Sequence, residues 1–326
     1  MHHGDAGVPM DALVAGVLLP FLLIVGYLCF VSRARRRNPA RPWRARRTVA
    51  FLVGAGLLAV ALLPPLASFA HRDFRGHMLQ HLLIGMYAPL ALVLGAPVTL
   101  LLRGLPTGAA RRLSRLVHSG PVRVLARPVV ALALSVGSLG ALYFTPLYDA
   151  TAGRPVAHGL LHLNFLLSGC LFAWVIAGLD PAPNRPSVPV RLVVLGVAVA
   201  AHATLSQLLY AGVGVGVHAP GGQVRGGAEI MYYGGDIAEL LLAGALIATW
   251  RPDRRRGRVT GAEVSRTGNS RTEVQGAEIP GTGSVDSPAP APGAVSPRAP
   301  GPLIPVDKPT RPAPADGRPG PAADPV

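Results

Sequence analysis

The stretch HMLQHLLIGMYAPLALVLGAPVTLLLR, residues 77–103, indicates the fold class. From Leu82 to Leu102 it contains no charged residue. A helix needs about 20 predominantly apolar residues to cross a hydrocarbon core of roughly 30 Å. The stretch therefore predicts a membrane-spanning helix. It also predicts that His77 and His81, spaced i and i+4, lie on one face of that helix.

Similar apolar runs occur along most of the chain. Of its 326 residues 50% are hydrophobic and only 14% are charged, and the charged residues gather between the apolar runs. We predict an all-α fold, a polytopic membrane protein with a bundle of seven transmembrane helices. The seven predicted spans cover residues 10–31, 48–70, 77–102, 128–148, 156–178, 190–211 and 229–250.

The arginines indicate an orientation. Twenty-one of them lie in the connections after the first, third and fifth spans and after the seventh, and four lie on the opposite side. Because cytoplasmic loops carry the excess of positive charge, we expect an N-terminus outside and a C-terminus in the cytoplasm of a bacterial inner membrane. The net charge of +15 is thus interpreted as a topology signal beside the lipid bilayer, not as a nucleic-acid surface.

The two termini differ from the spanning region. Residues 1–9 form a short predicted extracytoplasmic segment, and residues 10–256 form the predicted transmembrane domain. Residues 257–326 are rich in Pro, Gly and Ala and lack aromatic residues, as in SVDSPAPAPGAVSPRAP. Such a composition buries too little apolar surface to offset the entropy of ordering, so we expect a disordered cytoplasmic tail.

Polar residues inside spans are costly, so their positions are informative. With the predicted topology they all fall in the outer half of the membrane, on four different spans. Within spans they form pairs at helical spacing, which place both side chains on one face. The predicted site residues are His77, His81, His158, His162, His202, Asp236 and Glu239.

Two imidazoles one turn apart on a rigid helix suit a shared metal ion. Met78 and Met231 offer sulfur atoms suited to Cu(I), and His71 and His218, in predicted outer loops, are candidate secondary residues. A single histidine in a membrane helix also serves as an interhelical hydrogen-bond partner, and methionine more often packs. The joint placement of the seven residues favours a functional site.

The motif order resembles the CtaG family of bacterial cytochrome c oxidase assembly factors. The resemblance rests on residues 77–103, on HGLLHLNFLLSGCLFAWVIAGLDPAPNR at residues 158–185, and on His202 in AVAAHATLSQLLYAG. It implies an integral membrane factor needed for active terminal oxidase, linked to copper supply on the outer face. It implicates His77, His81, His158 and His162 together with His202. An oxidase subunit in the same membrane is the implied partner.

Two other functions are compatible with the residues. A membrane haem protein would use histidines of facing helices, such as His81 and His162, as axial ligands. A cation or proton transporter would need polar residues through both halves of the membrane, and the inner halves of these spans are nearly all apolar. No nucleophile with a base and no nucleotide-binding motif occurs, so we expect no enzymatic activity.

Overall fold

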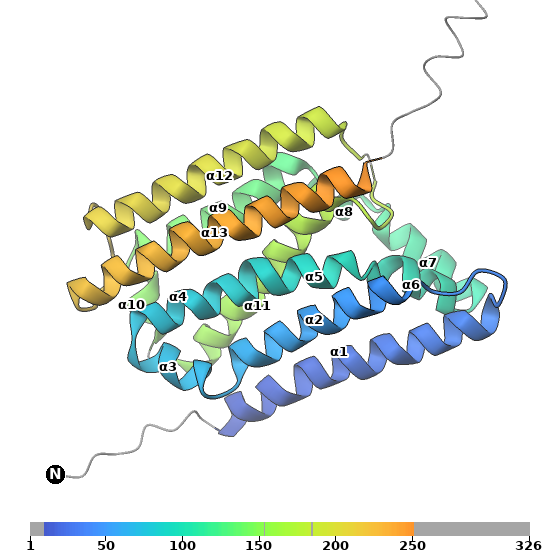
Figure 1. The fold of residues 1–326 in the computed structure, drawn as a ribbon, viewed down its shortest axis with the longest axis horizontal. Coiled ribbons are helices and arrows are strands. Elements are labelled where there is room, and N and C mark those ends of the chain that lie inside the picture. The colour runs from blue at the N-terminus through green and yellow to red at the C-terminus, as the bar shows by residue number, and fades with distance from the viewer. Residues whose placement is uncertain (1–9, 153, 184, 251–326) are drawn as a thin grey trace, which may run out of the picture. The chain divides into compact units, whose positions relative to one another are not determined.

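The computed structural model describes residues 10–152, 154–183 and 185–250, and within these ranges the regular elements are all helices, joined by loops, without any strand (Figure 1). Residues 1–9 and 251–326, and with them the predicted N-terminal segment and tail, lie outside the described residues. In chain order the elements are α1 (Met10–Arg37), α2 (Ala45–Leu62), α3 (Leu66–Arg72), α4 (Phe74–Leu82), the π-helical turn η1 (Leu83–Tyr87), α5 (Ala88–Leu94), α6 (Pro97–Gly104), α7 (Thr107–Val117), α8 (Gly120–Leu125), α9 (Pro128–Tyr143), α10 (Leu147–Ala152), α11 (Pro155–Ala177), α12 (Val188–Ala211) and α13 (Gly221–Thr249).

Six segments in the described residues are long and apolar enough to cross a membrane. They are α1 from Gly16, α2, the run of α4, η1 and α5 (Phe74–Leu94), α11, α12 and α13. The helix of the predicted fourth span, α9, is apolar but has only 16 residues. Multiple membrane-spanning helices are therefore supported, whereas the predicted number of seven is not confirmed.

The predicted span at residues 48–70 is two helices, which corrects the sequence prediction. Helix α2 ends at Leu62 and the short helix α3 begins at Leu66. Pro64 and Pro65 separate them, because proline lacks an N–H and disfavours helical backbone in the residue before it. Leu63 accordingly has extended backbone, with φ −106° and ψ 155°. The break places His71 at the end of α3 instead of in a loop.

The predicted span at residues 77–102 is also interrupted. The π-helical turn η1 precedes Pro89, which has no N–H to bond the carbonyl of Gly85. That carbonyl is packed against α11, since a Cβ atom on Gly169 would lie 2.0 Å from the Gly85 oxygen. Ala96, with φ 52°, then ends the segment before α6 begins at Pro97. The turn and the glycine therefore bring η1 and α11 close together just beyond His81.

The helices have two chemically different ends. At one end Arg33 Nε of α1 donates to the Gly104 carbonyl of α6, and Thr249 Oγ1 of α13 donates to the Ala177 carbonyl of α11. We call this end of the four helices the arginine end. At the opposite end Gly216 N donates to the Tyr143 carbonyl, and the ring of His71 on α3 lies near α11. We call this the histidine end; in Figure 1 α3 and α10 lie there, and α6 and α7 lie at the arginine end.

Helix α13 is longer than the predicted seventh span and packs through glycines. It starts at Gly221, eight residues before the predicted start at residue 229. Gly234 lies against Leu82 of α4 and its carbonyl accepts a 2.8 Å hydrogen bond from the Tyr87 hydroxyl, while Gly235 lies against His202 of α12. The small residues thus allow α13 to approach α4 and α12 closely.

Candidate functional site

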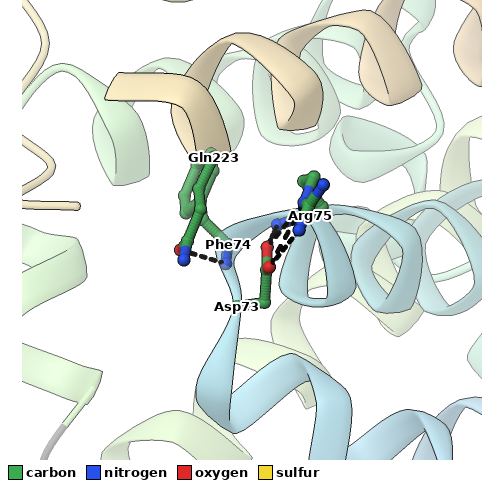
Figure 2. Close-up of polar contacts among 4 residues, drawn as sticks. All are labelled: Asp73, Phe74, Arg75 and Gln223. Atoms are coloured by element: carbon green, nitrogen blue, oxygen red, sulfur yellow. Dashed lines mark hydrogen bonds and ion pairs between the residues drawn. The ribbon is translucent and has the colours of Figure 1, made fainter. Parts of the chain in front are cut away.

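The start of α4 is held by polar contacts (Figure 2). Asp73 caps the helix, because its carboxylate accepts a 2.8 Å hydrogen bond from the Arg75 backbone N–H, and the Arg75 guanidinium also pairs with it at 2.6 Å. These hydrogen bonds from Arg75 lower the pKa of Asp73. The side-chain oxygen of Gln223 on α13 accepts from the Phe74 N–H at 3.2 Å. The first turn of α4, which carries His77, is therefore fixed against α13.

Five imidazoles from three helices lie side by side near this point, and we call them the histidine cluster: His71, His77, His81, His158 and His162. Within each helix the ring centroids are 4.3 Å apart for His77 and His81 and 4.4 Å apart for His158 and His162. Between helices they are 5.7 Å apart for His77 and His158, 6.0 Å for His81 and His162, and 5.8 Å for His71 and His158. The i, i+4 pairs predicted from sequence thus face each other across α4 and α11.

The two histidines of α4 are buried, those of α11 are half-buried and His71 is exposed, and several ring nitrogens of the cluster lack hydrogen-bond partners. His77 is 2% exposed and His81 4% exposed. No partner within the described residues bonds Nε2 of His77, either ring nitrogen of His81, or Nε2 of His162. Leaving a buried polar atom without a partner costs about 1–3 kcal/mol. Several such atoms in one place indicate a site that is completed by something other than these side chains.

Aromatic rings, which the sequence analysis did not single out, enclose the cluster. Phe165 lies edge-on to His81 with centroids 4.3 Å apart, and Tyr148 lies 4.9 Å from His77. Phe74 stacks near His77 at 5.9 Å, and Tyr143 is buried with its hydroxyl unpartnered among the described residues. The only sequence signal was the position of Tyr143 and Tyr148 at the end of a predicted span, at the same end as the histidines.

Two of the predicted residues, one on α12 and one on α13, form a separate pair. His202, 3% exposed, and Glu239, 5% exposed, place Nδ1 and Oε1 3.7 Å apart, which exceeds hydrogen-bond length. The His202 ring lies against the backbone of Gly235, where a Cβ atom would come within 1.8 Å of its Cε1. Only glycine at this position leaves room for the imidazole between the two helices.

A cavity of about 60 Å³ lies between this pair and the histidine cluster, and we call it the central cavity. Side chains of α4, α9, α11, α12 and α13 line it. Its wall includes His81 from the cluster, His202 and Glu239 from the pair, and both predicted methionines, Met78 and Met231. His81 therefore belongs to the cluster and to the cavity wall, and the predicted residues form two neighbouring groups that share it.

The remaining predicted residues lie elsewhere. Asp236 is half-buried on α13, one turn before Glu239, and does not line the cavity. His218 is exposed and its Nδ1 pairs with Asp149 Oδ2 at 2.5 Å, apart from the cluster. Among the described residues no three His, Cys, Asp or Glu side chains are placed to hold one metal ion together. Copper binding is therefore not shown by this geometry.

Comparison with known proteins gives relatives but no structural match. The chain is 35% identical over 202 residues to the uncharacterized protein Mb0105 of Mycobacterium bovis and to MT0111 of Mycobacterium tuberculosis, and 34% identical over 200 residues to ML1998 of Mycobacterium leprae. Each match covers 59% of this chain but only 30% of the relative, so the relatives are much longer proteins. No solved structure matches.

The family comparison confirms the resemblance predicted from the sequence. The family described as cytochrome c oxidase caa3 assembly factor, Caa3_CtaG, matches residues 25–253, which include the whole histidine cluster, the His202–Glu239 pair and the cavity wall. This chain belongs to the cytochrome c oxidase caa3 assembly factor family.

Proposed function

We propose that this protein serves oxidase assembly by holding copper at the histidine cluster and passing it to an oxidase subunit in the same membrane. Family membership supports the role in assembly. The observation that carries the copper proposal is the gathering of five imidazoles, several with unpartnered buried nitrogens, from α3, α4 and α11. In this proposal copper is a cargo that is bound and released.

The spacing of the rings suits one ion between two imidazoles. Nitrogen ligands lie about 2 Å from such an ion, so two ligating rings have centroids roughly 6 Å apart. The pairs His77 with His158 and His81 with His162, at 5.7 and 6.0 Å, match this span across the helix interface. Neutral imidazole is a good ligand for copper. Small rotations of the rings would bring the nitrogens of a pair onto one ion.

The geometry favours an ion over a haem group. A porphyrin between His81 and His162 would have to displace Phe165 and His77, whose centroids both lie 4.3 Å from that of His81. The central cavity of about 60 Å³ is also far below the roughly 300–1,000 Å³ of sites for larger ligands. We therefore place copper before haem as the bound species.

The proposed orientation places the cluster on the outer face of the membrane. Arginines concentrate at the arginine end, in the connections of α1 with α2 and of α6 with α9, and this end is assigned to the cytoplasm. The histidine end then opens toward the extracytoplasmic side. Many exposed side chains along the helices between the two ends are apolar, including Leu160, Val193 and Leu240, and these suit contact with lipid or with a membrane-embedded partner.

Copper content tests the proposal. The double variant His77→Ala with His162→Ala removes one ring from each side of the cluster, and we expect detergent-purified protein to lose the copper bound at the cluster. Membranes of cells that carry the variant should show reduced terminal oxidase activity. The matched control is His118→Ala, because His118 is an exposed imidazole at the end of α7. Equal copper content and equal oxidase activity in the double variant and the control would overturn the proposal.

A further inference from the structure

The central cavity has walls of unusual chemistry for the interior of a helix bundle. Its lining is mostly apolar, yet His81 contributes two buried ring nitrogens without partners among the described residues. Nδ1 of His202 and Oε2 of Glu239 are likewise buried and unpartnered there. Buried polar groups are normally hydrogen-bonded, so a cavity edged by several unpaired ones requires an occupant.

Two thioethers complete the donor set. Met78 on α4 and Met231 on α13 are each 1% exposed and line the same cavity. Thioether sulfur is a soft ligand that selects Cu(I), and imidazole also accepts copper. Met side chains are flexible, so their sulfur atoms adjust readily to an ion. The nearby carboxyl group of Glu239 offers charge compensation for a monovalent cation.

The size and position of the cavity agree with an ion. A volume of about 60 Å³ accepts an ion or a few water molecules and excludes a larger ligand. His81 stands in the wall and also lies 4.3 Å from His77 and 6.0 Å from His162, measured between ring centroids. It is therefore the side chain through which cargo in the histidine cluster would reach the cavity.

We propose that the central cavity is a second, deeper Cu(I) site, formed by Met78, Met231 and His202 and supplied from the histidine cluster through His81. The inference rests on the proposed function, because it concerns the same cargo. It adds a sulfur-ligated site in the middle of the bundle, distinct from the imidazole cluster near the histidine end.

Anaerobic titration of the full chain in detergent with Cu(I), against a chromogenic chelator, tests the inference. We expect two bound equivalents, with X-ray absorption at the copper edge showing sulfur neighbours at about 2.3 Å. The double variant Met78→Leu with Met231→Leu conserves volume and should fold normally, as thermal unfolding and size-exclusion elution will check. It should lose the sulfur neighbours in the X-ray absorption spectrum and bind one equivalent of Cu(I) fewer than the wild type.

The double variant His158→Ala with His162→Ala separates the two sites, because neither residue lines the cavity. It should lose the Cu(I) equivalent bound at the histidine cluster and keep the sulfur neighbours of the ion in the cavity. The deeper site would be overturned if the wild type showed no sulfur neighbours, or if the methionine variant kept them. Water would then be the occupant of the central cavity. If the histidine variant still loses copper in that case, the proposed function stands. A wild type that binds no Cu(I) would overturn both.

Discussion

A buried carboxylate at the arginine end and a buried imidazole at the histidine end differ in how fully they are hydrogen-bonded. At the arginine end Asp180 is 2% exposed, and its carboxylate accepts hydrogen bonds from Val98 N at 3.0 Å, Thr99 N at 2.8 Å and Thr99 Oγ1 at 2.5 Å. At the histidine end His81 is similarly buried, yet neither ring nitrogen has a partner among the described residues.

This difference separates structural from functional polar groups. A carboxylate that accepts several hydrogen bonds at the start of a helix stabilises that helix and needs nothing further. An imidazole left without a partner makes the fold less stable, and it is retained where a ligand completes it. Mutations at the two ends should therefore change the free energy of unfolding in different ways. Three experiments measure these changes.

The largest loss in the free energy of unfolding is expected at the arginine end. Asp180→Ala leaves the first N–H groups of α6 unpaired in a buried position, and hydrogen bonds to a charged group are worth about 1.5–3 kcal/mol each. We expect a loss of about 3 kcal/mol in the free energy of unfolding, measured by denaturation in detergent. Asp180→Asn, which keeps one acceptor, should lose less. Copper bound per folded molecule should not change; a fall in copper without a loss of stability would contradict the comparison.

A smaller loss is expected between the two ends, where α12 meets α13. Gly235→Ala places a methyl group within 1.8 Å of the His202 ring, so the ring must move away from Glu239. Overpacking of this kind costs about 1–3 kcal/mol. Gly244→Ala on the same helix is the control, because nothing lies within 4 Å of its added methyl group, and it should stabilise α13 by about 0.5–1 kcal/mol. Equal thermal shifts of the same sign in both variants would refute this packing.

The smallest change in the free energy of unfolding is expected at the histidine end, where the substitution should stabilise the protein. His81→Leu replaces two unpartnered buried nitrogens by apolar surface, so metal-free protein should gain about 1 kcal/mol in the free energy of unfolding. His118→Leu, at an exposed position, should leave stability nearly unchanged. Thermal unfolding in the presence of a chelator measures both. If His81→Leu destabilises the metal-free protein, the His81 nitrogens are already satisfied and the contrast between the ends fails.

The sequence analysis located the helices better than their ends and breaks. The long apolar runs predicted α11 and α12 within two residues at each boundary, since apolar composition over some 20 residues is a local property. Continuous spans were predicted across Pro64 and Pro65 and across η1, where the structure has a break and a π-helical turn. Although the prolines were visible, whether a proline bends a span or ends it depends on the packing around it, such as the contact of Gly85 with Gly169.

The membrane-spanning helical class, the family, and the pairing of His77 with His81 and of His158 with His162 could be predicted from sequence, because each depends on residues close together along the chain. Long-range packing was needed to show that these pairs meet between α4 and α11 and that the break after α2 adds His71. It was also needed to show that His202 and Glu239 form a separate pair in the wall of the central cavity. Which faces of two helices meet depends on close non-local packing, such as Gly235 against His202, and periodicity along one helix does not specify its partner.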